Sequence, residues 1–227
     1  MNLGQKREII TTGDGSKTIH FPEIREQYHS THGAIQESRH VFIDKGLTYY
    51  VKQNPSEPLR ILEMGFGTGL NAFLTCLEAE NQKINVQYYG IEAYPVSLLE
   101  IQELNYTSLI DPDATQIFQE LHQSEWEDHV KITSYFELYK RQELFENIQD
   151  SNTYHIIYFD AFGARVQPEL WTVAIFKKMF KALQSEGVLV TYAAKGSVRR
   201  AMQEVGFTVE RLPGPPGKRE MLRASKI

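Results

Sequence analysis

A short segment with three glycines is the first candidate for a ligand-binding turn. It reads Glu63-Met64-Gly65-Phe66-Gly67-Thr68-Gly69 and separates a short apolar run from an amphipathic segment. Glycines allow a sharp turn and let the main chain approach a ligand closely. The third glycine comes one residue earlier than in the nicotinamide fingerprint, and no Gly-Lys-Ser/Thr follows as in a phosphate-binding loop. The spacing therefore favours a cofactor without phosphates, such as S-adenosylmethionine. Another nucleotide and a purely structural turn are the alternatives.

Two acidic residues follow apolar runs and are candidates for the same site. Glu92 follows Val86–Ile91, and Asp160 follows Tyr154–Phe159. In an open α/β sheet, ligands bind at the carboxyl ends of the strands. A carboxylate at Glu92 can accept the hydroxyls of a ribose, and Asp160 can stabilise a sulfonium, orient an amine nucleophile or accept its proton. The alternatives are a solubilising acid at Glu92 and a helix N-cap at Asp160.

The elements that position these residues alternate between strands and helices. Strands are expected at 59–64, 86–91, 130–133, 154–159, 187–192, 207–211 and 220–223. Helical segments are expected after the glycine turn and over 98–129, 169–185 and 198–205. This alternation predicts an α/β, Rossmann-like fold with a mostly parallel seven-stranded sheet covered on both faces. The last two strands, joined around 213–217 without a helix, predict a C-terminal antiparallel hairpin.

An N-terminal extension precedes this pattern. Two short strands flank the turn Gly13-Asp14-Gly15-Ser16, and apolar residues from Ala34 to Phe42 recur at helical spacing. We therefore expect residues 1–50 to form a hairpin and a helix packed on a methyltransferase-type domain at 51–227.

Composition limits the class of protein. The chain has 227 residues, of which 41% are apolar and 23% charged, which is enough for one α/β domain. Cys76 is the only cysteine, so no internal disulfide can form and a cytoplasmic location is expected. No apolar run reaches membrane-spanning length, and the N-terminus lacks a secretory signal. His29 and His32 have no apparent third ligand, so no metal site is expected.

Charge is unevenly distributed along the chain. The net charge is −5, which argues against a general nucleic-acid binder. Residues 195–227, however, hold eight basic and three acidic side chains. This segment predicts a local basic face for an RNA backbone, with an ordinary solvated surface as the alternative.

Several further motifs resemble one methyltransferase family. They are YHSTHGA with QESRHVF (28–42), LEMGFGTGLNAF (62–73), DAF (160–162), PELW (168–171), VTYAAKGSVRRAMQEVGFTV (190–209) and GKREML (217–222). Together they resemble the MnmC-like (MnmD) enzymes that complete 5-methylaminomethyl-2-thiouridine at the wobble position of certain tRNAs. The glycine motif is common to many methyltransferases, whereas the ESRHVF, PELW, GSVRR and GKREM combination is more particular.

The resemblance implies a reaction, a cofactor and a partner. The reaction is transfer of a methyl group from S-adenosylmethionine to the amine of 5-aminomethyl-2-thiouridine in the tRNA anticodon stem-loop. Some members carry a flavin oxidase domain that generates this amine. This chain ends soon after GKREM, so no FAD is expected and an upstream tRNA-modifying enzyme is expected to supply the aminomethyl group. The family often has Gly-Asp near the third strand, where this sequence has Ile132–Phe136, and its DGFAP-like motif appears here as Asp160–Ala164.

Site residues follow from the turn, the two carboxylates and the resemblance. Asp160 is the expected catalytic residue. The expected cofactor-binding residues are Tyr28, Ser38, Glu63, Gly65, Gly67, Gly69, Asn71, Glu92 and Asp160. The expected tRNA-binding residues are Lys195, Arg199, Arg200, Lys218 and Arg219.

Other functions remain compatible with the residues. One is a methyltransferase or aminopropyltransferase acting on a small-molecule or protein amine. Another is a non-catalytic RNA-binding partner with a methyltransferase fold, against which the intact glycine turn, Glu92 and Asp160 argue.

Overall fold

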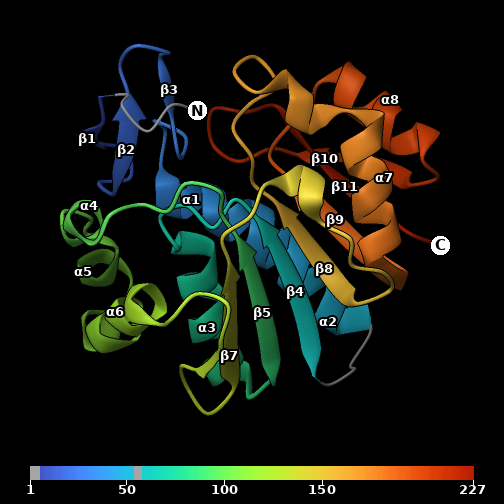
Figure 1. Ribbon diagram of the computed structural model, residues 1–227. Helices are drawn as coiled ribbons and strands as arrows, with labels where there is room; N and C mark the ends of the chain where they lie inside the picture. The colour runs from blue at the N-terminus through green and yellow to red at the C-terminus, as the bar shows by residue number, and fades with distance from the viewer. Residues whose placement is uncertain (1–5, 54–57) are drawn as a thin grey trace.

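A mostly parallel sheet forms the centre of the computed structural model, which describes residues 6–53 and 58–227. Its eight strands are β4 (Leu59–Met64), β5 (Val86–Ile91), β6 (His129–Lys131), β7 (Phe136–Arg141), β8 (Tyr154–Phe159), β9 (Leu183–Thr191), β10 (Thr208–Pro213) and β11 (Glu220–Ser225). Their order is β10-β11-β9-β8-β4-β5-β7-β6 (Figure 1). β6 pairs antiparallel with β7, and β11 pairs antiparallel with both β9 and β10. The expected Rossmann-like sheet and C-terminal hairpin are thus confirmed.

The carboxyl ends of four parallel strands lie level at one edge of this sheet. Met64 at the end of β4 pairs with Ile91 of β5 and with Phe159 of β8. Ile91 in turn pairs with Arg141, the last residue of β7. The segments that follow these strands therefore emerge side by side, including the glycine turn and both candidate carboxylates.

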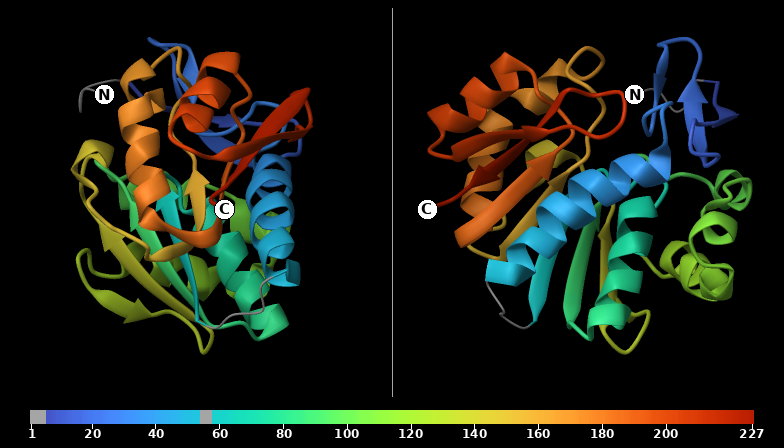
Figure 2. Two further views of the ribbon diagram at one scale, coloured as in Figure 1. Left: turned by 90° about the vertical axis from the view of Figure 1, so that its right-hand side faces the viewer. Right: turned by 180° about the vertical axis from the view of Figure 1, so that it is seen from behind.

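Helices cover both faces of the sheet. They are α1 (Ala34–Ser38), the π-helix η1 (Arg39–Thr48), α2 (Tyr49–Gln53), α3 (Leu70–Gln82), α4 (Leu98–Gln102), α5 (Tyr106–Ile110), α6 (Thr115–Gln123), α7 (Val173–Ala182) and α8 (Gly196–Glu204). Three short 3-10 turns are η2 (Pro112–Ala114), η3 (Phe145–Asn147) and η4 (Pro168–Trp171). The rod formed by α1, η1 and α2 lies with α3 on one face, and α7 and α8 lie on the other (Figures 1 and 2). The apolar run of β8 serves both faces, since Ile156 and Tyr158 join one buried cluster while Ile157 and Phe159 join the other.

The N-terminal helix is part of the core. Val41, Phe42 and Leu47 are at most 1% exposed, and the Phe42 ring centroid lies 5.1 Å from that of Tyr158 in β8. The boundary expected at residue 50 falls inside α2. The first five residues of the expected extension lie outside the described residues.

The expected N-terminal hairpin is confirmed. β1 (Glu8–Thr11) pairs antiparallel with β2 (Lys17–Phe21), and β3 (Glu26–Gln27) adds a third short strand. This small sheet stands apart from the central sheet, on the α4–α6 side of the molecule (Figure 1).

The expected third strand was only partly correct. Residues 130–133 overlap β6, a short strand at the outer edge, whereas the parallel strand beside β5 is β7. The sheet thus has eight strands in the described part of the chain rather than seven. β7 carries a buried lysine, Lys140, in place of an apolar residue, and this charge hid the strand from a search for apolar runs.

The expected helical stretch 98–129 is divided into short pieces. Ser97 forms a capping box that begins α4, and Pro112 begins the turn before α6.

No helix within residues 6–53 and 58–227 is long and apolar enough to cross a bilayer.

Candidate active site

The glycine turn bends over the end of β5. The N–H groups of Gly65 and Phe66 both donate to the carbonyl oxygen of Ile91, at 3.0 and 2.9 Å. Gly67 has a φ of +50°, and a Cβ at this position would lie 2.9 Å from the Tyr28 ring. Only glycine fits here without displacing Tyr28, so the turn and the N-terminal segment lie in close contact.

Two main-chain amides hold Glu92 just after β5. The N–H of Gly67 donates to Oε2 and the N–H of Tyr94 donates to Oε1, both at 3.0 Å. Burial raises the pKa of the Glu92 carboxyl, and these hydrogen bonds oppose that effect. A carboxylate oxygen accepts more than one hydrogen bond, so Glu92 keeps acceptor capacity suited to a pair of ribose hydroxyls.

Asp160, just after β8, shares one amide with a fully buried carboxyl group. Asn71 Nδ2 donates to Asp160 Oδ2 and to Glu63 Oε1, both at 2.8 Å. Burial raises the pKa of Asp160 to about 7; nearby Glu37 raises it as well, while Asn71 and Lys218 lower it. Burial also raises the pKa of Glu63. Two carboxylates this close do not both ionise readily, so a proton near neutral pH is available to be held or taken up here.

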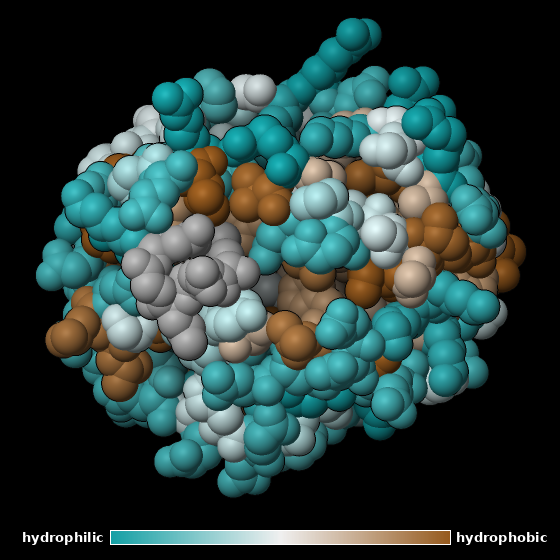
Figure 3. Space-filling model, turned by 45° about the horizontal axis from the view of Figure 1, so that its top comes forward, coloured by the Kyte–Doolittle hydropathy of each residue, from teal (hydrophilic) through white to brown (hydrophobic). Residues whose placement is uncertain are grey.

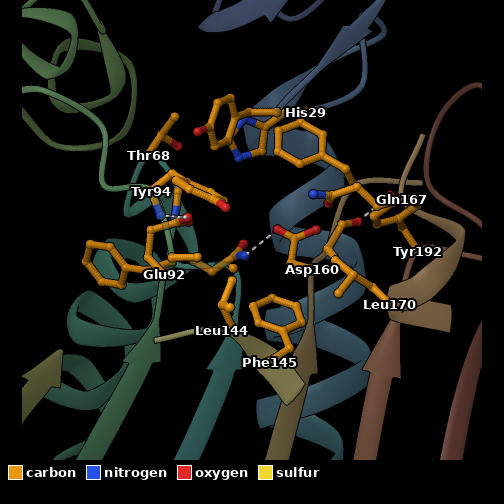
Figure 4. Close-up of a pocket in the computed structure, with 18 of the residues that line it drawn as sticks. His29, Thr68, Glu92, Tyr94, Leu144, Phe145, Asp160, Gln167, Leu170 and Tyr192 are labelled. Atoms are coloured by element: carbon orange, nitrogen blue, oxygen red, sulfur yellow. Dashed lines mark hydrogen bonds between the residues drawn. The ribbon is translucent and has the colours of Figure 1, made fainter. Parts of the chain in front are cut away.

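Glu92 and Asp160 line a single cavity of about 210 Å³. Figure 4 shows them on opposite sides, with Leu144 and Phe145 from the segment after β7 between them. In the space-filling view from above this edge, a hollow with apolar atoms at its floor opens among hydrophilic residues (Figure 3). The expected cofactor-binding residues that line the cavity are Tyr28, Gly65, Gly67, Asn71, Glu92 and Asp160.

Three expected cofactor-binding residues do not line the cavity. Glu63 is fully buried and reaches it only through Asn71. Gly69 is the N-cap residue that precedes α3 and lies against the His122 ring. Ser38 is fully buried in α1, and its hydroxyl has no hydrogen-bond partner among the described residues.

Several cavity residues were not found from the sequence. Leu144, Phe145 and Glu146 follow β7, and Tyr192 follows β9. Thr68 lies within the glycine turn, and Tyr94 lies two residues after Glu92. The comparison of Ile132–Phe136 with the family's Gly-Asp was misplaced, because that segment precedes β7 and lies at the opposite edge of the sheet. Correct assignment of β7 would have pointed to residues 142–146, since ligands meet the carboxyl ends of strands.

The basic side chains expected to bind RNA divide into two groups. Lys218 forms an ion pair with Glu37, and its Nζ lies 3.9 Å from the Tyr192 ring centroid. It is therefore engaged beside the cavity instead of being free for a phosphate. Lys195, Arg199 and Arg200 at the start of α8, together with Arg219, make no ion pair within residues 6–53 and 58–227.

Comparison with known proteins identifies the family. A family model described as S-adenosyl-L-methionine-dependent methyltransferase matches residues 110–227, more than half of the chain. The chain belongs to this family. The methyltransferase is also similar to the crystal structure of MnmC2 from Aquifex aeolicus, with a TM-score of 0.79 and 27% identity over 98% of this chain and 71% of that one.

Longer relatives match the methyltransferase over nearly its whole length. A protein of Leptospira borgpetersenii serovar Hardjo-bovis named tRNA 5-methylaminomethyl-2-thiouridine biosynthesis bifunctional protein MnmC is 28% identical over 97% of this chain. A Burkholderia mallei protein of the same name is 27% identical over 94% of it. The chain spans 34% of each relative's length. A spermidine synthase from Thermotoga maritima shares the fold, with a TM-score of 0.55 at 13% identity.

The cavity fits the cofactor of this family. Glu92 offers acceptor capacity for ribose hydroxyls, and Gly65 and Gly67 bring main chain without a side chain to the cavity wall. Asn71 Oδ1 is buried without a hydrogen-bond partner among the described residues. A buried acceptor is normally satisfied, so this atom is suited to a donor such as the amino group of S-adenosylmethionine. The resident residues thus match both ends of the cofactor.

Proposed function

We propose that this methyltransferase methylates the exocyclic amine of 5-aminomethyl-2-thiouridine at the wobble position of tRNA, giving 5-methylaminomethyl-2-thiouridine. The observation that carries the proposal is the placement of Asp160, a carboxyl group with a pKa near neutrality, in the same cavity as Glu92. The names of the MnmC relatives and the similarity to MnmC2 support the substrate.

Each end of the cavity has a separate task. Glu92 would hold the ribose, and Asn71 with the glycine turn would hold the amino-acid part of the cofactor. When bound, S-adenosylmethionine supplies a methyl group already activated by its sulfonium. The protein therefore needs no covalent intermediate, and its work is to align an amine with that methyl group and exclude water.

Asp160 accepts the proton of the acceptor amine. An alkyl amine is mostly protonated at neutral pH, and each pH unit below its pKa costs about 1.4 kcal/mol to supply the free base. A carboxyl group with a pKa of about 7 is partly ionised at neutral pH and can accept that proton. Phe162, Leu170 and Tyr192 line the cavity, and Figure 4 shows Leu170 and Tyr192 on the side of Asp160. These three residues provide the apolar surface against which a base would lie.

The tRNA partner is assigned to basic side chains that are exposed (Lys195, Arg200 and Arg219) or half-buried (Arg199). Lys195, Arg199, Arg200 and Arg219 are without an ion pair in the described part of the chain, and we assign them to the anticodon stem-loop backbone. A cytoplasmic location and an upstream enzyme that supplies the aminomethyl group complete the proposal.

Nucleoside mass spectrometry with purified protein tests the reaction. tRNA carrying 5-aminomethyl-2-thiouridine should gain one methyl group in the presence of S-adenosylmethionine. Asp160→Asn should bind the cofactor within about threefold of the wild-type affinity by calorimetry, yet lower turnover by roughly 10²–10⁴-fold. Glu103→Gln, at an exposed acid directly after α4 that does not line the cavity, is the matched control and should retain activity.

Two results would contradict the proposal. If the modified tRNA gains no mass, it is not the substrate of this protein. Full turnover by Asp160→Asn would remove Asp160 from the proton transfer.

A further inference from the structure

One ion pair beside the cavity joins the N-terminal helix to the C-terminal hairpin. Glu37 in α1 pairs with Lys218 in the loop between β10 and β11, and the two side chains are 7% and 30% exposed. Glu37 also accepts a hydrogen bond from the N–H of Ser30 at 3.0 Å. A second contact lies where this loop begins, because His40 Nε2 is 2.8 Å from the carbonyl oxygen of Pro213, the last residue of β10. The hairpin loop is thus docked on the N-terminal helix.

The ion pair reaches the cavity through Tyr192. The Lys218 ammonium lies 3.9 Å from the Tyr192 ring centroid, and Tyr192 lines the cavity. The Tyr192 hydroxyl donates to the carbonyl oxygen of Ala161 at 2.7 Å. Ala161 follows Asp160 directly, so the pair contacts a residue that holds the main chain beside the catalytic carboxyl.

We propose that Glu37 and Lys218 are positioning residues for the acceptor end of the cavity, which hold Tyr192 in its wall and balance the charge that Asp160 experiences. Neither residue lines the cavity, so both act through others. That the acceptor end of the cavity receives an amine rests on the proposed function. The effect of Glu37 and Lys218 on the ionisation of Asp160 does not depend on it.

The groups that surround Asp160 determine its pKa. They are Glu63 on β4, Tyr88 on β5, Asn71 on α3, Tyr192 after β9, Glu37 on α1 and Lys218 from the β10–β11 loop. Lys218 is the cation among them. Glu37 raises the pKa of Asp160 and Lys218 lowers it, so the two charges of the pair act on Asp160 in opposite directions.

Removing one partner should therefore shift the pKa of Asp160 in a direction set by the partner that remains. In Glu37→Gln, the Lys218 cation is left without its acidic partner, and the pKa of Asp160 should fall by at least about 0.5 unit. In Lys218→Met, Glu37 is left unpaired and the pKa of Asp160 should rise. In the double variant, the pKa of Asp160 should lie between the values of the two single variants.

Carbon-13 NMR of aspartate carboxyl groups in the free protein measures this pKa, with the Asp160 signal assigned by its loss in Asp160→Asn. Lys218→Arg keeps the charge and should retain the wild-type pKa. Lys131→Met, on exposed β6 at the opposite edge of the sheet, controls for the loss of one cation. Shifts in the same direction for both single variants, or no shift in either, would overturn the proposal. If Lys218→Met does not fold, Glu37→Gln decides alone, because a raised or unchanged pKa would overturn it.

A kinetic measurement extends the test to the reaction. The acidic limb of the pH profile of kcat/KM should move in the same direction as the pKa in each variant. Because the NMR titration needs no substrate, failure of tRNA methylation would leave its result intact, and the two proposals can fail separately.

Discussion

Asn71 determines how the two buried carboxyl groups of the site share charge. Its amide nitrogen donates to both Glu63 and Asp160, so the two acids are held at fixed positions on either side of it. Glu63 is completely buried and its pKa is raised, whereas Asp160 borders the cavity. The more deeply buried acid is therefore the better holder of a proton, and Asp160 remains the group that can exchange one with a substrate.

Gly67 provides a residue-scale test of the cofactor site. In Gly67→Ala the new methyl group would lie 2.9 Å from the Tyr28 ring, at a φ of +50° that costs alanine about 1–2 kcal/mol. Either the ring or the turn must move, and both line the cavity. We expect calorimetry to show S-adenosylmethionine affinity reduced by at least about tenfold, with a lower melting temperature.

Gly163→Ala is the matched control for Gly67→Ala. A Cβ at Gly163 would have its nearest neighbour at 3.8 Å, an ordinary contact. Unchanged cofactor affinity in Gly67→Ala would mean that the turn does not hold the cofactor.

Sequence patterns predicted the residues that follow the strongly apolar strands. Gly65, Glu92 and Asp160 were found because β4, β5 and β8 are apolar runs that end at a glycine or an acid. Lys218 was assigned to RNA because charge along the chain does not reveal an ion pair with Glu37, which lies 181 positions away. Such pairing depends on the tertiary fold, so a count of basic residues overestimates the free basic surface.

Among the elements, β7 is the strand that could not be predicted from the sequence, because a lysine interrupts its apolar pattern. The residues Phe136, Leu138 and Lys140 are buried and alternate with half-buried neighbours, which is the period of a strand. Lys140 is tolerated inside because its ammonium donates to the carbonyl oxygens of Leu121 and His122, at 2.9 and 3.0 Å, at the end of α6. A lysine that caps a helix from a neighbouring strand cannot be recognised without the fold.

Lys140 also makes the stability of this region depend on pH. Burial lowers the pKa of Lys140 to about 8. Between this value and the ordinary value near 10.5, the unfolded chain binds more protons than the folded one, so the free energy of unfolding rises with pH. Relative to Lys140→Met, the wild type should gain about 1–2 kcal/mol between pH 8 and 10.

Urea unfolding at a series of pH values checks this gain. Comparison with Lys140→Met removes the contributions of other titrating groups, and Lys131→Met on the neighbouring strand should follow the wild type. A constant difference between wild type and Lys140→Met across this pH range would contradict the expected titration.

At the scale of the whole molecule, segments distant in sequence enclose the cavity. Tyr28 comes from the segment after β3, and Tyr192 from the segment after β9, while the carboxyl ends of β4, β5, β7 and β8 supply the floor. Local pattern predicted the part of the floor that follows β4, β5 and β8, because these strands alternate with helices in an α/β fold, and it missed the part that follows β7. The walls depend on how the N-terminal segment and the C-terminal hairpin pack, which only the assembled fold determines.

Substitutions of basic side chains in α8 test how the molecule recognises RNA. Each phosphate contact releases counterions, so the logarithm of the binding constant should fall with the logarithm of salt concentration by about 0.7–0.9 per contact. Arg199→Gln with Arg200→Gln should lower this slope by about 1.4–1.8 for an anticodon stem-loop RNA, measured by fluorescence anisotropy.

A matched pair of surface lysines separates local contacts from overall charge. Lys131→Gln with Lys177→Gln removes the same charge from β6 and from the exposed side of α7. If the basic residues of α8 contact the RNA backbone, this control should leave the salt slope unchanged. Equal reductions in both double variants would mean that the RNA responds to net charge alone, and the assigned surface would then be wrong.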